Sequence, residues 1–551
     1  MKKLLSLFLC ACMIFALAAC GTDDPGTQES AGAQGETAGF DFTYVGDPPT
    51  TLNLLMATSN MDLTALGYTQ AGLFRLVEGK LENDLCESYT VSDDNLTYTF
   101  TLRDATWTDG ESVTSEQFEY ALSRMLDPAG AFSYALYFYP IANAEAYNTG
   151  EVASWDEVGV ECPDEKTLVI TLDYPYASFL ETITDNGMFP MRQDFVEAQG
   201  ESYGTSPETI PYCGPYTIES WEVTNSITYI KNPNYWNAEN SFYADKITCQ
   251  YIQDKGTAFA MYENGEVDCI LSLDDVYKDV APADELVTHM MGSTGVILVN
   301  QNGLTPEAGE LLSNNNFRLA LNYAIDREKY NIYGSELPTT RMIPSTYTTA
   351  DGTPVVEAYD VFSVPVTGDV ELAKDYLSKA MDELGYSSVD ELPTLQMVTY
   401  ESTAIRPYME LVIDMWSQNL GLNNISFTQL PIGSAIGQYY ATQYDLFYFT
   451  FAYGNAEFDE LGYFVTGNDG NLGIWKNEEY DSLLDEIRRT IDDEERYELL
   501  RQAEEIFNEE SPIIPLSERI TFSCLKPEFT GATFDSGTIG SNYFIYLQKT
   551  A

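Results

Sequence analysis

Apolar residues recur at helical spacing along much of the chain. In residues 115–125, Phe118, Leu122 and Met125 fall on one side of a predicted helix. The same spacing predicts helices over residues 317–325, 411–416, 483–491 and 499–507. Gly421 is placed to end the helix over 411–416, because glycine tolerates the left-handed conformation that often follows a helix.

Shorter segments follow strand patterns instead. Residues 98–102, and in part 168–172, alternate along the chain with a period of two, and residues 295–300 form a continuous apolar strand. A strand begins at Ile425, and another covers residues 513–516, directly after the helix break at Ser511-Pro512. Mixed strands and helices of this kind predict an α/β protein.

The N-terminal residues have the pattern of a signal for export. Lys2 and Lys3 precede an apolar stretch over residues 4–19, which is shorter than the ~20 residues of a membrane-spanning helix. The stretch ends in Leu17-Ala18-Ala19-Cys20, which resembles the bacterial lipobox. We expect residues 1–19 to be removed and Cys20 to become lipidated. Residues 21–39 lack large apolar side chains, so residues 20–39 are expected to form a flexible tether.

Length and charge restrict the remaining possibilities. A chain of 551 residues is too long for one hydrophobic core, so at least two lobes are expected. The formal net charge is −59, from 27 Lys and Arg against 86 Asp and Glu. Such a surface repels phosphate backbones, and nucleic-acid binding is therefore excluded.

Residues for catalysis or metal binding are scarce. The only histidine is His289, so a zinc site with several histidines is excluded, and His289 is predicted to be structural. The motifs G-x-S-x-G and H-E-x-x-H are absent, and Gly79-Lys80 lacks the rest of a phosphate loop. We expect no enzyme, no cofactor and no metal.

The cysteines outside the leader form no C-x-x-C pair and are predicted to be buried free thiols. They are Cys86, Cys162, Cys213, Cys249, Cys269 and Cys524.

Several short motifs occur together in a recognisable order. They are LTYTFTLR at residues 96–103, WTDG at 107–110, CGPY at 213–216, KNPNYW at 231–236, GEVD at 265–268, FRLAL at 317–321 and AIDR at 324–327. With these motifs the chain resembles the dipeptide/oligopeptide class (family 5) of extracellular solute-binding proteins of ABC importers. The resemblance runs from about Tyr44 to the C-terminus.

The resemblance implies an α/β, two-lobed periplasmic-binding-protein-like fold, of type II in the large cluster with an extra subdomain. Lobe I would comprise residues 40–297 plus 513–551, with an inserted subdomain at about 82–205, and lobe II residues 298–512. Two crossing strands, at 296–300 and 513–516, would join the lobes. The ligand would be enclosed between the lobes by a hinge motion.

The motif residues themselves are predicted to define the fold rather than to bind ligand. Trp107 with Asp109 and Gly110 predicts a turn closed by an aromatic side chain, with Gly110 at a positive φ. Gly214-Pro215 predicts a tight entry into a strand. Arg318, Asp326 and Arg327 are predicted to brace a helix surface.

In relatives, the main chain of a peptide pairs with short strands from both lobes. The first such edge here is expected at residues 46–50, with Gly46, Asp47 and Thr50 as candidates, and the second at residues 444–461. Aromatic candidates for ligand contact are Tyr134 and Tyr137 from the first lobe and Tyr448 and Phe451 from the second. For each aromatic residue, core packing remains an open alternative.

The second edge departs from the pattern of peptide-binding relatives, which reads Trp-x-Ala-Asp-Tyr. Phe451, Tyr453, Gly454 and Asn455 occupy its four defined positions. Gly454 therefore replaces the aspartate that holds the ammonium group of the peptide, and Tyr448 replaces an arginine that some relatives have upstream. Glu457, Asp459 or a carboxylate elsewhere would replace the aspartate, unless the ligand has no terminal amine.

The resemblance also implies the setting in which the protein works. We expect a monomer on the outer face of the cytoplasmic membrane, held to the membrane surface through Cys20 and delivering oligopeptides to an ABC permease and its ATPase. Two alternatives remain open: a non-peptide solute such as a sugar or a metal chelate, and a role as a receptor for a peptide signal.

Overall fold

The computed structural model describes residues 39–550 except 58, 78–79, 133, 186–187, 239–243, 331–334, 350–352, 403, 452–458, 469 and 535–543. The leader, Cys20 and most of the tether lie outside these residues. No helix in the described part of the chain has both the length and the apolar character needed to cross a membrane.

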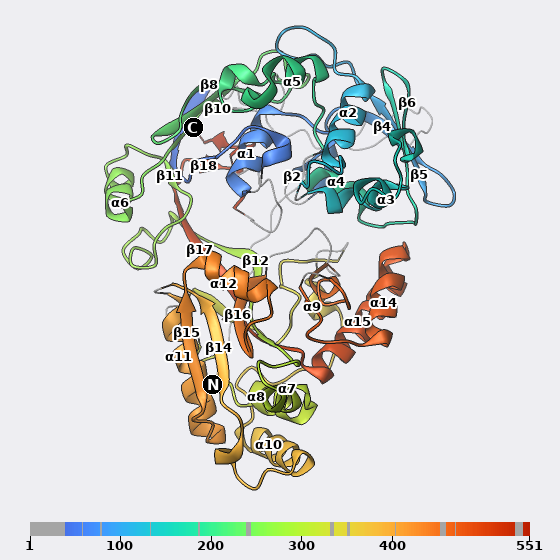
Figure 1. Ribbon diagram of the computed structural model, residues 1–551. Helices are drawn as coiled ribbons and strands as arrows, with labels where there is room; N and C mark the ends of the chain where they lie inside the picture. The colour runs from blue at the N-terminus through green and yellow to red at the C-terminus, as the bar shows by residue number, and fades with distance from the viewer. Residues whose placement is uncertain are drawn as a thin grey trace, which may run out of the picture. The chain divides into compact units, whose positions relative to one another are not determined.

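One sheet of 11 strands runs through both predicted lobes (Figure 1). Its strands are, in sheet order, β15 (Ile425–Leu430), β14 (Leu395–Tyr400), β16 (Leu446–Phe451), β12 (Leu286–Val299), β17 (Ile513–Leu525), β11 (Cys269–Ile270), β1 (Phe40–Val45), β10 (Ala244–Gln250), β9 (Ser226–Lys231) and β8 (Tyr216–Glu222), with β13 (Glu336–Pro338) paired to β17.

The long strands β12 and β17 form an antiparallel ribbon in the middle of this sheet. Pairing runs from Leu286 opposite Cys524 to Leu298 opposite Ile513, with irregular register between Met290 and Thr294 and again between Gly295 and Val296. The predicted crossing segments 296–300 and 513–516 begin within these two strands. The ribbon extends further than the apolar pattern suggests, because polar residues after position 516 continue β17.

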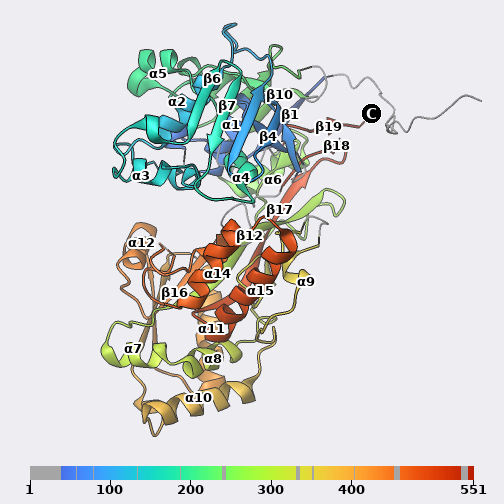
Figure 2. The ribbon, with the colours of Figure 1, turned by 90° about the vertical axis from the view of Figure 1, so that its right-hand side faces the viewer.

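The two faces of the sheet in lobe II follow the alternation of β12 and β16. Ile297 and Tyr448 belong to one buried cluster, and Val296 and Phe447 to another. The first face packs against α7 (Pro306–Ser313), α8 (Asn315–Tyr323), α10 (Val370–Leu384) and α11 (Ile405–Leu420). The second packs against α12 (Ile432–Tyr440), α14 (Glu478–Arg489) and α15 (Asp493–Glu510). In both views α14 and α15 lie below α3 (Ala144–Asn148) and α4 (Phe179–Asp185) (Figures 1 and 2).

Lobe I carries a second, smaller sheet inside the predicted subdomain. Its order is β4-β5-β7-β6, formed by Cys86–Val91, Thr97–Leu102, Thr167–Thr171 and Val160–Asp164. The predicted helix is α2 (Ser115–Met125), which buries Phe118, Leu122 and Met125. The remaining elements of lobe I include α1 (Asn60–Thr69), α5 (Gln193–Gln199), α6 (Lys255–Glu263), β2 (Phe74–Val77), β3 (Lys80–Asn83), β18 (Phe529–Thr530) and β19 (Gln548–Lys549).

The motif residues lie at points that hold the fold. Trp107 is 1% exposed, and its indole N–H donates to Gln117. The N–H of Gly110 donates to the Trp107 carbonyl and closes the turn, and Gly110 has a φ of +93°. Arg318 in α8 donates to the Glu510 carbonyl (2.9 Å), and Arg327, which follows α8 and lies in no helix, donates to the Pro515 carbonyl (2.8 Å). They therefore fix the beginning of β17.

The cysteines and helix ends agree with the sequence patterns. All six cysteines outside the leader are free thiols, and all but Cys162 are buried. Gly421 follows α11 with a φ of +76°, and Ser511 follows α15 with a φ of +46°.

Candidate functional site

The predicted first edge follows β1 and is held by a buried carboxylate. Asp62, at 0% exposure, accepts from the Thr50 N–H (2.6 Å), the Thr50 hydroxyl (3.1 Å), the Thr51 N–H (3.2 Å) and the Ser59 N–H (3.2 Å). Backbone and side-chain donors of Thr50 are thus bonded within the protein. Asp47 is exposed. Asp62 fixes the shape of this edge.

Gly46 connects the edge to the sheet. Its N–H donates to the Gln250 carbonyl at 3.2 Å. A Cβ at this position would lie 2.9 Å from the ring of Tyr44 and 3.1 Å from the Cys249 sulfur. The backbone therefore packs closely here, and a side chain would require its neighbours to move.

The aromatic candidates of lobe I lie beside the same carboxylate. The rings of Tyr134 and Tyr137 stack with centroids 5.8 Å apart. Burial, followed by the negative charge of Asp62, raises the pKa of Tyr134. The structure thus brings Tyr134 near the segment that contains Thr50. Asp62 is not among the residues predicted from the sequence, although Ser59 and Asp62 form a capping box that is visible as Ser-x-x-Asp.

The second edge, at β16, separates its two candidates onto opposite faces of the sheet. Phe451 is 1% exposed and packs against Phe449, Tyr463 and Phe464, with ring centroids 5.1, 5.3 and 5.6 Å away. Phe451 therefore belongs to the face that α12, α14 and α15 cover. Tyr453, Gly454, Asn455 and Glu457 lie outside the described residues.

Tyr448 points into the core of lobe II. It is 2% exposed, and burial raises its pKa to about 12. Its hydroxyl lies 3.4 Å from the Thr450 hydroxyl, and a Cβ on Gly295 would lie 2.8 Å from the Tyr448 oxygen. These contacts belong to the packing of this face.

Two buried glutamates flank the ribbon at β17. Glu336, at 5% exposure, accepts from the Ser517 hydroxyl at 2.6 Å and lies 3.6 Å from Arg519. Glu518, at 6% exposure, accepts from the backbone N–H (2.9 Å) and the hydroxyl (2.8 Å) of Ser345. The sequence pattern missed both residues. Three consecutive polar residues after the apolar run 513–516 were the available signal.

Among the described residues, contacts between the lobes also occur away from the ribbon's hydrogen bonds. The guanidinium carbon of Arg489, in α14, lies 4.7 Å from the ring centroid of Tyr174 in the subdomain. The Ser335 hydroxyl donates to Asp275 at 2.5 Å. The first contact can hold the lobes together as a cation–π interaction.

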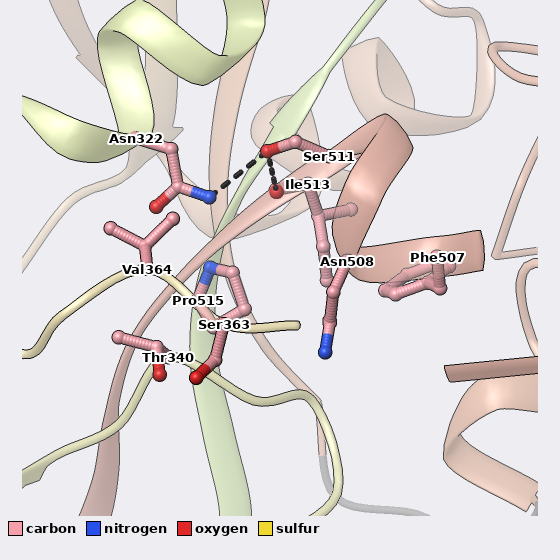
Figure 3. Close-up of a pocket in the computed structure, with 9 residues that line it drawn as sticks. All are labelled: Asn322, Thr340, Ser363, Val364, Phe507, Asn508, Ser511, Ile513 and Pro515. Carbon is pink, nitrogen blue, oxygen red and sulfur yellow. Dashed lines mark hydrogen bonds between the residues drawn. The ribbon is translucent and has the colours of Figure 1, made fainter. Parts of the chain in front are cut away.

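A small pocket lies at the beginning of β17, within lobe II (Figure 3). Its volume is about 250 Å³, including space open to solvent. Asn322 donates to the Ser511 hydroxyl at 3.0 Å, and that hydroxyl donates to the Ile513 carbonyl at 3.3 Å (Figure 3). None of the predicted ligand residues lines this pocket. Among the described residues no three His, Cys, Asp or Glu side chains are grouped so as to hold a metal.

Comparison with known proteins gives a consistent result. Residues 80–471 match the model of bacterial extracellular solute-binding proteins, family 5. The chain is 30% identical over 527 residues to the dipeptide-binding protein DppE of Bacillus subtilis, covering 94% of this chain and 93% of that protein. It is 28% identical over 478 residues to the oligopeptide-binding protein OppA of the same organism, covering 85% of each.

The fold agrees with this similarity. The structure of the substrate-binding domain of an oligopeptide ABC transporter from Bacillus anthracis matches with a TM-score of 0.74 and 25% identity, covering 94% of this chain and 100% of that one. The predicted two-lobed α/β fold is confirmed. The chain belongs to the bacterial extracellular solute-binding proteins of family 5.

Proposed function

We propose that this protein captures oligopeptides between its two lobes and delivers them to the membrane permease of an ABC importer. The observation that carries the proposal is full-length similarity to a dipeptide-binding protein, at 30% identity over 94% of this chain. Because the similarity covers nearly the whole chain, a ligand unlike a peptide would have to be bound through local sequence differences within the same fold.

The geometry of the two edges supports the proposal. Strand addition needs backbone groups presented in a fixed extended conformation. Residues 46–50 follow β1 directly and are tied down by Asp62. On the other lobe, β16 ends at Phe451 beside an aromatic group formed with Phe449, Tyr463 and Phe464. This packing fixes the end of β16 within the predicted second edge.

Absence of catalysis is part of the proposal. The single histidine, His289, lies on the ribbon with its ring nitrogen 2.9 Å from the Ser523 hydroxyl and its ring packed near Phe534. Its position between paired strands indicates a structural role. The family is one of solute-binding proteins, and transport by such proteins needs binding and closure rather than bond cleavage.

The proposal extends to the cellular setting. A lipid on Cys20 would hold the monomeric protein at the outer face of the cytoplasmic membrane. One lipid anchor and a polar tether keep a binding protein near its permease without fixing its orientation. The partners are the permease and the ATPase that drives it.

Native mass spectrometry of the full chain, purified from cells grown in peptide-rich medium, tests the proposal. We expect adducts of a few hundred daltons that disappear on denaturation and fragment as peptides. A single non-peptide adduct, together with no binding of added peptides, would overturn the peptide assignment and favour a different solute. Peptide adducts of one sequence only would favour a signal receptor over a general importer.

A further inference from the structure

Glu518 is a buried carboxylate to which the described part of the protein supplies no positive charge. Its hydrogen-bond donors are the backbone N–H and hydroxyl of Ser345, at 2.9 and 2.8 Å. Among the described residues it takes part in no ion pair, whereas Arg519, its neighbour in sequence, is paired with Glu336. Burial raises the pKa of Glu518, and no cation opposes that shift. A charge left in this state is costly unless something else pairs with it.

The register of the sheet places Glu518 on a particular face. Thr294 of β12 lies opposite Glu518 of β17 on one side and opposite Phe451 of β16 on the other. Directly opposed residues in antiparallel strands point to the same face. Glu518, Thr294 and Phe451 therefore form one row across three strands. Adjacent strands are about 4.8 Å apart, so the row spans roughly 10 Å.

The row ends where the predicted second edge begins. Phe451 is the last residue of β16, and residues 452–458 follow it. The Thr294 hydroxyl donates to the Met342 carbonyl at 2.9 Å, so it does not compete for Glu518. On the other side of β17, the partner of Glu518 is Leu337, which is apolar. Glu518 is thus the charged member of an otherwise neutral row that leads to the edge.

Arg519 and Glu336 lie on the opposite face. After the irregularity at Val296, Ser517 and Arg519 lie on the same face of the sheet as Tyr448, and Ser517 donates to Glu336 there. The ribbon itself therefore separates Glu518 from the guanidinium of Arg519. The nearest cation in the sequence cannot neutralise it without crossing the sheet.

The oxygen atoms available at Glu518 indicate which kind of cation it can bind. Calcium takes six to eight oxygen ligands and magnesium six, and one carboxylate with one hydroxyl cannot supply them. The described residues also provide no cluster of metal-binding side chains. An ammonium group needs only one carboxylate and a few further acceptors, and it pairs at about 2.7–2.9 Å.

We propose that Glu518 binds the ammonium group of the ligand, which for a peptide is its terminal amine. The assignment rests on the proposed peptide-binding function and makes it more specific. It puts the amine beside the β12–β17 ribbon rather than in the segment 452–458. The positive charge of the ligand then neutralises the negative charge of Glu518, on the ribbon that joins the lobes.

The test compares Glu518→Gln with Glu336→Gln in the full chain. Both glutamates are buried, both accept from a serine, and they differ in the face they occupy. The probes are two random peptide pools of two to six residues, one with free and one with acetylated amino termini, titrated in native mass spectrometry. We expect wild type to prefer the free-amine pool by about 30-fold or more, the usual effect of removing one member of a buried charge pair.

Glu518→Gln should lose that preference by weakening binding of the free-amine pool, while Glu336→Gln keeps wild-type affinity within about threefold. Equal affinity of wild type and Glu518→Gln for free-amine peptides would overturn the assignment and leave peptide binding intact. Failure of wild type to bind either pool would overturn peptide binding itself, and the assignment with it. If Glu518→Gln does not fold, the free-versus-acetylated ratio of wild type decides, because equal binding of both pools contradicts an amine site.

Discussion

Glu504 and Glu518 are both glutamates buried in the same chain, yet their surroundings are opposite. Glu504 is 0% exposed and receives both nitrogens of the Arg341 fork, together with the Tyr359 hydroxyl at 2.9 Å. Burial acts to lower the pKa of Arg341, but the hydrogen bonds and charge of Glu504 outweigh it and raise that pKa. Among the described residues, Glu518 has only the two donors of Ser345.

The difference teaches how to distinguish a structural carboxylate from a binding carboxylate. When a buried acid with a complete internal set of partners is neutralised, its partner is left as an unpaired buried charge, so the fold is destabilised. A buried acid with an incomplete set destabilises the free protein and is therefore expected to meet its partner only in a complex. The two classes should respond to neutralisation with opposite signs.

The largest effect is expected at the compensated pair. Glu504→Gln leaves the Arg341 guanidinium, whose side chain is 12% exposed, without its carboxylate. The free energy of unfolding should fall by about 3–5 kcal/mol. Urea denaturation followed by tryptophan fluorescence measures this change. Glu498→Gln, an exposed position on the same helix that pairs with Arg501, should unfold like wild type. If the two variants unfold at the same urea concentration, the Glu504 carboxylate is not needed to compensate Arg341.

An intermediate effect is expected at Asp62, which accepts from three backbone N–H groups. Asp62→Asn places an amide against the N–H groups of Thr50, Thr51 and Ser59 and should lower the free energy of unfolding by about 1–3 kcal/mol. Asp47→Asn, at an exposed neighbour, should change stability by less than about 0.5 kcal/mol. Hydrogen exchange should report faster opening of residues 46–50 in Asp62→Asn alone.

The smallest effect, with the reverse sign, is expected at Glu518. Because burial raises its pKa, the folded ligand-free protein holds a proton there more tightly than the unfolded chain does. Its contribution to stability is full below the ordinary glutamate pKa and is lost as pH rises through the raised folded value. Glu518→Gln should therefore be more stable than wild type at pH 7, by roughly 1 kcal/mol, and equally stable near pH 4.

Thermal unfolding of ligand-free wild type and Glu518→Gln from pH 4 to pH 7 measures this difference. Because the two proteins share all other acidic groups, the contribution of those groups to the pH dependence cancels in the comparison. A variant that is less stable than wild type at pH 7 would show that Ser345 alone satisfies the carboxylate. With saturating free-amine peptide the order should reverse, since only wild type gains the charge pair.

Much of the fold was predictable because local pattern and burial agree. The helix over residues 115–125 has the same bounds in the structure, since its buried side Phe118, Leu122 and Met125 and its capping box are both local signals. Gly421 ends α11 for the equally local reason that its φ is positive. The polar residues of β17 gave a weaker signal, three consecutive polar positions after the apolar run 513–516. Residues 517–519 are held by Glu336 and Ser345, more than a hundred positions earlier in the chain.

The candidate site was predictable only in outline. Alternation indicates that Phe451 and Tyr448 lie on opposite faces of a strand, but it cannot tell which face the ligand meets. The register irregularity beside Val296 decides that Glu518, and not Arg519, shares a face with Phe451. Such an irregularity depends on both paired strands and leaves no mark in either one alone.

The central place of β17 also has a consequence for biogenesis. This strand pairs with β11, β12 and β13, which all precede it in the chain. A chain synthesised only to residue 512 would leave one open edge on β12 and one on β11, which would still be paired with β16 and β1 on their other sides. Open edges of this kind recruit other strands and lead to aggregation. Completion of the sheet therefore waits for residues 513–525, and export must keep the preceding strands from associating until that segment arrives.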